Sequence, residues 1–164
     1  MKKWILILIC LFLLIIDNSL MPFLSIKGAY PSLLFIFAVA YSIISGRKEA
    51  IIIGVISGVL QDIYFSQIFG LNALINMLIC LISAVIGENI YIEKKFVPTV
   101  AIVFLYLVKI LGIGIIFKLI NKSINMEIGM YTSLYSGVIM FLVYNSVLRL
   151  CDIDNKKKSW RFRW

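Results

Sequence analysis

The sequence has no histidine, only three cysteines and only eight acidic residues in a chain of 164. Histidine is a common acid–base catalyst and metal ligand, and neither a glycine-rich phosphate loop nor a cluster of metal ligands takes its place. Cys10, Cys80 and Cys151 lie in or at the end of apolar runs without paired spacing, which argues against disulfides and a zinc site. The sequence therefore predicts no enzyme and no cofactor.

A hydrophilic stretch long enough for a soluble domain is also missing. Hydrophobic residues make up 62% of the chain, and the mean hydropathy is +1.04. A soluble domain is typically about half apolar, so the expected solvent is a lipid bilayer. The first residues, "MKKWILILICLFLLII", imitate a signal peptide but lack a small-residue cleavage site, and the apolar run continues past Asp17. We interpret them as a retained first membrane helix.

Apolar segments of roughly the length that spans a bilayer predict an all-α, polytopic membrane protein with six transmembrane helices in one compact bundle. The segments are 4–24, 31–46, 50–66, 70–90, 96–118 and 129–150. Pro31 and Pro98 fit the first turns of the second and fifth segments, where a missing N–H is tolerated. We expect a membrane domain over residues 1–151 and a cytoplasmic tail over 152–164.

The basic residues predict the orientation, because cytoplasmic loops are rich in Lys and Arg. One set of segment ends carries twelve of the 16 basic residues, and the other carries three, Lys27, Lys118 and Lys122. Both termini are therefore expected on the cytoplasmic side of a membrane that the chain crosses several times.

The stretch "GVISGVLQDIYFSQIFGLNALINM" carries glycines and polar residues inside an apolar chain. Ala50, Gly54, Gly58 and Asp62 recur every four residues and form one stripe on a helix. Small residues let membrane helices approach closely, so this stripe predicts a packing face, either for a neighbouring helix or for a partner protein.

Three charged residues fall at one depth. Asp17, Asp62 and Lys109 each lie about 13 residues, or about 20 Å, from the expected cytoplasmic end of their segment. Asn72 and Asn76 on the returning segment reach the same level. We predict a buried polar layer in the outer half of the membrane, in which Lys109 balances the two acids as a structural ion pair. The alternative is an unrelated set of snorkelling charges.

The tail "NKKKSWRFRW" mixes cations with aromatic residues. Such juxtamembrane residues are attracted to anionic lipid and to the interface. The tail therefore predicts contact with anionic lipid or a partner rather than with nucleic acid. The residues concerned are Lys156, Lys157, Lys158, Trp160, Arg161, Arg163 and Trp164.

The run from Gly54 to Ala73 resembles the signature of the bacterial rod-shape-determining protein MreD family, in Gly54, Gly58, Gln61–Asp62 and Gly70–Leu71–Asn72–Ala73. The resemblance implies a non-enzymatic scaffold of the cell-wall elongation machinery in the bacterial cytoplasmic (inner) membrane. It also implies a fold similar to the S components of energy-coupling-factor transporters. The implied partner is the bitopic protein MreC, in an assembly with MreB, a SEDS glycosyltransferase and a penicillin-binding protein. Gly54, Gly58 and Asp62 would be marked positions of the family.

Two other functions fit the same features. A small-molecule (vitamin) binder like an S component would suit an outer polar layer, but residues 4–24 contain no alanine, whereas S components dock through alanines on their first helix. An ion-coupled transporter is disfavoured by the small size and the lack of internal repeats.

Overall fold

The computed structural model describes residues 3–26, 28–65, 68–89, 96–119 and 126–161. These residues form six α-helices and one short 3-10 helix, which confirms the all-α prediction. In chain order the elements are α1 (Lys3–Ser19), η1 (Met21–Leu24), α2 (Leu33–Ser45), α3 (Arg47–Phe65), α4 (Leu71–Glu88), α5 (Phe96–Leu119) and α6 (Met126–Arg161).

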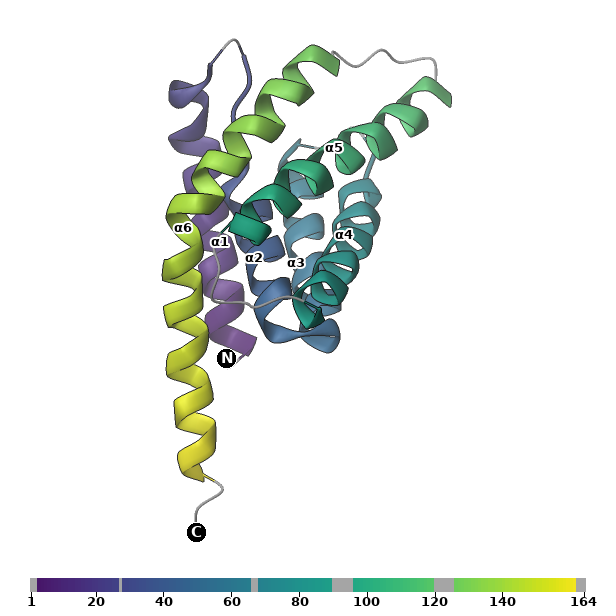
Figure 1. Cartoon of the computed structure of the whole chain (residues 1–164). Helices are drawn as coiled ribbons and strands as arrows, with labels where there is room; N and C mark the ends of the chain where they lie inside the picture. The colour runs from purple at the N-terminus through teal and green to yellow at the C-terminus, as the bar shows by residue number, and fades with distance from the viewer. Residues whose placement is uncertain (1–2, 27, 66–67, 90–95, 120–125, 162–164) are drawn as a thin grey trace.

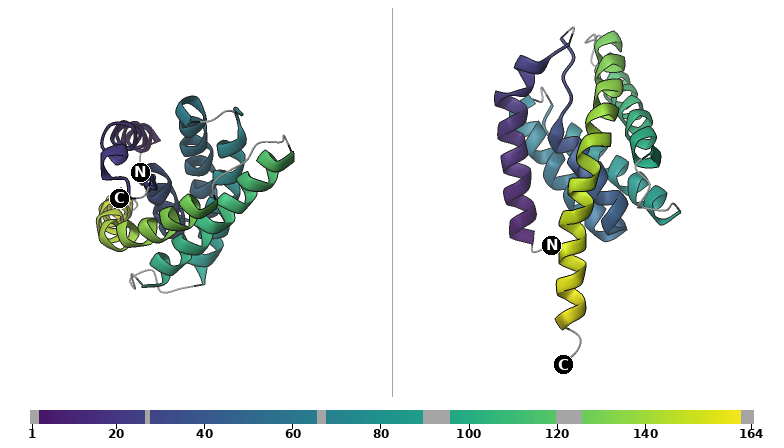
Figure 2. Two further views of the ribbon diagram at one scale, coloured as in Figure 1. Left: turned by 90° about the horizontal axis from the view of Figure 1, so that it is seen from above. Right: turned by 60° about the vertical axis from the view of Figure 1, so that its left-hand side comes forward.

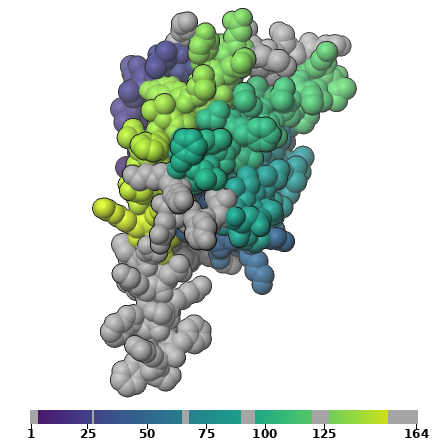
Figure 3. Space-filling view, viewed as in Figure 1, coloured from purple at the N-terminus to yellow at the C-terminus, as the bar shows by residue number. Residues whose placement is uncertain are grey.

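Successive helices run in alternating directions, so that α1 begins and α6 ends at the same end of the bundle (Figure 1). Helices α5 and α6 contact one another and lie across one face of the other helices, as the space-filling view also shows (Figure 3). The bundle is therefore built from α1 to α4 with the α5–α6 pair laid over one side.

Helix α2 forms the centre of the bundle, since it contacts each of the other five α-helices. Ten consecutive residues, from Leu34 to Ile43, are buried. An apolar helix that is covered all round belongs to a core rather than to a surface. Alanines and a serine at positions 38, 40 and 42 leave room for the surrounding helices.

The helix ends differ from the predicted ones at two places before α2. The first segment was expected to reach Leu24, but α1 ends at Ser19 and η1 follows. Pro31 was expected in the first turn of α2, which is wrong: the N-cap is Ser32, whose hydroxyl accepts a hydrogen bond from the Phe35 N–H at 3.2 Å. Serine is a preferred N-cap, so Pro31 lies just outside the helix. Pro98 does lie in the first turn of α5.

Helices α3 and α4 touch backbone to backbone through the predicted small-residue stripe. A Cβ added at Gly54 would lie 2.7 Å from the Met77 Cα, and one added at Gly58 would overlap the Ala73 Cα. Real Cβ atoms do not come this close to a backbone, so only glycine fits at these two positions. The close-packed neighbour of the stripe is therefore α4.

Three described helices are long and apolar enough to cross a membrane by length and composition: α4, α5 and the Glu127–Cys151 part of α6. Helix α2 has 13 residues, about 20 Å at 1.5 Å per residue, which is shorter than a hydrocarbon core of about 30 Å. Because α2 is surrounded by other helices, its length is not set by contact with lipid.

Helix α6 runs without a break past the expected domain boundary at residue 151. It has 36 residues, or about 54 Å, and its C-terminal part projects beyond the other helices (Figure 2). The first ten residues of the predicted tail thus have helical backbone. The side chains of residues 152–164, including all seven expected to meet lipid, lie outside the described part, so the lipid contact stays a prediction.

Candidate functional site

The carboxylate of Asp62 holds the start of α4. It accepts hydrogen bonds from the backbone N–H groups of Gly70, Asn72 and Ala73, each at 3.0 Å, and from the Asn72 side-chain amide at 3.1 Å. The first N–H groups of a helix have no partner within the helix, and its positive dipole end favours an anion. Asp62 is only 3% exposed, so the start of α4 supplies the compensation that a buried carboxylate needs.

The turn before α4 depends on a glycine. Gly70 is the N-cap residue of α4 and has φ +92° and ψ −13°. Residues other than glycine adopt this left-handed backbone conformation only at a cost in energy. This conformation places the Gly70 N–H and the next turn of N–H groups around one carboxylate. The Gly70–Leu71–Asn72–Ala73 motif therefore supplies the hydrogen-bond donors that bind the Asp62 carboxylate.

Asp17, at the end of α1, holds the start of α2 in the same way. It accepts hydrogen bonds from the Ser32 hydroxyl at 2.8 Å, from the Leu33 N–H at 2.7 Å and from the Leu34 N–H at 3.1 Å. Asp17 is 2% exposed. The two buried carboxylates thus both accept hydrogen bonds from backbone N–H groups at the start of a helix, Asp17 at α2 and Asp62 at α4.

Lys109 does not form the expected ion pair. Among the described residues its ammonium has neither Asp17 nor Asp62 within 4 Å, and it donates a hydrogen bond of 2.9 Å to the Gln61 Oε1. The ammonium also lies 4.2 Å from the centre of the Phe35 ring, a cation–π distance. The expected direct pair is therefore wrong, because backbone N–H groups occupy both carboxylates.

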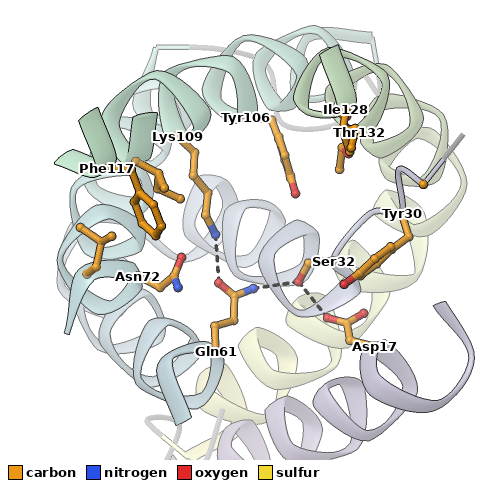
Figure 4. A pocket seen from close by; sticks show the side chains of 13 residues that line it. Asp17, Tyr30, Ser32, Gln61, Asn72, Tyr106, Lys109, Phe117, Ile128 and Thr132 are labelled. Atoms are coloured by element: carbon orange, nitrogen blue, oxygen red, sulfur yellow. Dashed lines mark hydrogen bonds between the residues drawn. The ribbon is translucent and has the colours of Figure 1, made fainter. Parts of the chain in front are cut away.

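Gln61 joins the predicted polar residues into one network. Its Oε1 accepts from Lys109 and, at 2.9 Å, from the Asn76 amide, and its Nε2 donates to the Ser32 hydroxyl at 2.8 Å. Since Ser32 in turn donates to Asp17, a chain of hydrogen bonds runs from Lys109 to Asp17 (Figure 4). Asp62 and Asn72 form a second group beside it.

Sequence reasoning missed Gln61 and Ser32 as members of the polar layer. The sequence could have indicated both residues. Gln61 directly precedes Asp62, and Ser32 directly precedes an apolar run, where an N-cap residue is expected. Asn76, which was expected in the polar layer, is completely buried. Its Oδ1 has no hydrogen-bond partner in the described part of the chain.

A cavity of about 440 Å³ lies over this network, and we call it the Lys109 cavity. Its walls come from α1, α3, α4, α5, α6 and the segment before α2, and the side chains of Lys109, Tyr106 and Tyr30 converge on it (Figure 4). Small-molecule sites have volumes of about 300–1,000 Å³. The lining residues are Asp17, Gly28, Tyr30, Ser32, Gln61, Leu71, Asn72, Tyr106, Lys109, Ile113, Phe117, Ile128 and Thr132.

The described residues contain no group of three or more His, Cys, Asp or Glu side chains that could hold a metal ion. The chemistry that the network does offer is binding and orientation. Its cation, amides and hydroxyls can hold polar groups of a ligand.

Comparison with known proteins gives one result. The search found no match among curated proteins or solved structures. The sequence model of one family, rod shape-determining protein MreD, matches residues 1–153, which is nearly the whole chain and includes every residue that lines the Lys109 cavity. The chain belongs to the MreD family of rod shape-determining membrane proteins.

Proposed function

We propose that this protein is a non-enzymatic scaffold of the bacterial cell-wall elongation machinery and that it binds an MreC-type bitopic membrane protein. The observation that carries the proposal is the family match over residues 1–153, which implies a role in determining rod shape. In the same proposal, MreB, a SEDS glycosyltransferase and a penicillin-binding protein belong to the wider assembly, and anionic lipid contacts the tail.

The arrangement of small residues supports a partner site elsewhere than on the α3 stripe. Gly54, Gly58 and Asp62 were candidates for a partner interface, but all three face α4, so that α4 occupies the surface they form. Apolar residues on the outside of the bundle are free to meet lipid or another membrane helix. On α1 they include Trp4, Leu8, Phe12 and Ile15, which lie along one exposed face.

Partner binding is tested by co-purification. The full chain and a tagged MreC-type protein are expressed together, extracted in mild detergent and purified through the tag. We expect the chain to elute with its partner at about equal stoichiometry. An unrelated membrane protein with the same tag is the control. If the chain stays folded and monodisperse but does not elute with the partner, the scaffold proposal is wrong.

The proposal includes six membrane-spanning segments with both termini in the cytoplasm. Two observations support this topology. Twelve of the 16 basic residues lie at one set of segment ends, and α1 begins and α6 ends at the same end of the bundle (Figure 1). The three native cysteines are buried, so new cysteines can be labelled selectively. Glu127→Cys should react with an impermeant thiol reagent in intact cells, and Lys48→Cys only after permeabilisation. The opposite pattern would reverse the topology.

A small-molecule binder similar to an S component is the second candidate, and the Lys109 cavity is the observation that favours it. The neighbouring genes separate the two candidates. A gene for a bitopic coiled-coil protein beside this one favours the scaffold, and a gene for an ATPase favours the binder.

A further inference from the structure

One face of α5 carries a gradient from polar to apolar along the wall of the Lys109 cavity. Tyr106, Lys109, Ile113 and Phe117 all line the cavity and are spaced three or four residues apart, so they lie on one side of the helix. Lys109 lies ten residues, about 15 Å, before the end of α5. Ile128, in the first turn of α6, continues the apolar wall.

The charge of Lys109 is the least compensated one at this site. The carboxylates of Asp17 and Asp62 accept three and four hydrogen bonds, and each lies at the positive end of a helix. A lysine ammonium has three donors, and the described residues offer an oxygen to only one of them, the Gln61 Oε1. Lys109 is only 6% exposed, so bulk water does not take the place of a counter-ion.

We propose that the Lys109 cavity binds the anionic group, carboxylate or phosphate, of a small amphipathic ligand. The anionic group accepts hydrogen bonds from Lys109 and from the nearby Tyr106 hydroxyl. The apolar part of the ligand lies along Ile113, Phe117 and Ile128. This inference goes beyond the scaffold role and does not depend on it.

The direction of the gradient separates two sources of such a ligand. A bilayer lipid has its charged headgroup at the membrane surface and its chains inside. The cavity has the opposite order, with the cation deep and the apolar residues toward the end where α5 stops and α6 starts. The geometry therefore favours a small soluble anion over a lipid headgroup, and the experiment includes both.

The probe is 4-(4-fluorophenyl)butanoate, with the neutral 4-(4-fluorophenyl)butanamide as its matched control. The full chain is reconstituted in phosphatidylcholine nanodiscs, and binding is measured by ¹⁹F NMR line broadening. Because a charge-assisted hydrogen bond is roughly twice as strong as a neutral one, we expect the acid to bind about tenfold more tightly than the amide. Lys109→Met should remove this preference, whereas Lys118→Met, at the exposed end of α5, should retain it.

Ile128→Trp is a second variant that keeps Lys109 and fills the apolar end of the cavity. It should weaken binding of the acid and of the amide equally. Added phosphatidylglycerol that displaces the acid would identify lipid headgroups as the source, and failure to displace it would identify a soluble anion. Equal binding of acid and amide to the unaltered protein, or a full preference in folded Lys109→Met, would overturn the proposal. Neither result bears on co-purification with an MreC-type partner.

Discussion

The α3–α4 contact and the α5–α6 contact both use glycine, but in different ways. At Gly54 and Gly58 the atoms that an added Cβ would meet belong to the backbone of α4. At Gly129 and Gly137 of α6 the nearest atoms belong to the side chains of Ile110 and Val103. A side chain can change its rotamer, whereas a helix backbone can move only as a whole. The first contact is therefore rigid and the second is adjustable.

The difference matters for the Lys109 cavity because its walls come from both sides of the molecule. Asn72 and Gln61 lie on the rigid α3–α4 pair, and Ile113, Phe117 and Ile128 lie on the adjustable α5–α6 pair. The amides of Gln61 and Asn72 are thus carried by the part that cannot shift. Lys109, Tyr106 and the apolar wall are carried by the part that can adapt to the shape of a ligand.

Gly58→Leu should have the largest effect, because a branched side chain would occupy the space of the Ala73 backbone. We expect little folded protein in membranes, since α3 and α4 could no longer meet. Gly58→Ala should still destabilise the protein by about 3 kcal/mol, at the upper end of ordinary overpacking. The amount of monodisperse protein after detergent extraction measures the effect. Normal yield of both variants would show that the rigid contact does not exist.

Asp62→Asn should have the next largest effect. One carboxylate oxygen becomes an NH₂ group that faces N–H donors at the start of α4, so we expect a loss of about 2–4 kcal/mol in the free energy of unfolding. Unfolding in mixed micelles measures this loss.

A second substitution sharpens the Asp62 test. Because Lys109 contacts Gln61 and not Asp62, Lys109→Met should change the stability by the same amount with and without Asp62→Asn. A direct Asp62–Lys109 pair would instead make the two effects clearly non-additive in a double-mutant cycle that includes Lys109→Met alone.

Gly129→Ala should have the smallest effect. Its new Cβ would lie 2.8 Å from the Cδ1 and 2.9 Å from the Cγ2 of Ile110, and both atoms belong to a side chain that can change its rotamer. We expect a change below about 1 kcal/mol. Gly54→Ala is the matched variant on the rigid contact and should cost clearly more in the same unfolding experiment. Equal costs would remove the distinction between the two contacts.

The sequence predicted six helical segments and the burial of Asp17, Asp62, Asn76 and Lys109. Long apolar runs indicate helices, and a charge or amide inside such a run has to face the interior of the protein. The sequence did not predict the partners of Asp17 and Asp62. These partners are backbone N–H groups, which every residue has, and only the turn at Gly70 and the start of α2 bring them to the carboxylates. Counting along helices also leaves the rotation of each helix unknown, so Lys109 was assigned to the wrong acceptor.

The sequence separation of the polar contacts implies an order of assembly. Asp62 binds backbone groups only 8 to 11 residues further on, and Asp17 binds groups 15 to 17 residues further on, whereas Lys109 and Gln61 are 48 residues apart. Local contacts form before distant ones because closing a long loop costs more entropy. During synthesis both acids can find their helix starts before α5 has left the ribosome. Gln61 gains its hydrogen bond from Lys109 only after α5 is made, and the Lys109 cavity is complete only after the start of α6, with Ile128 and Thr132, has packed against it.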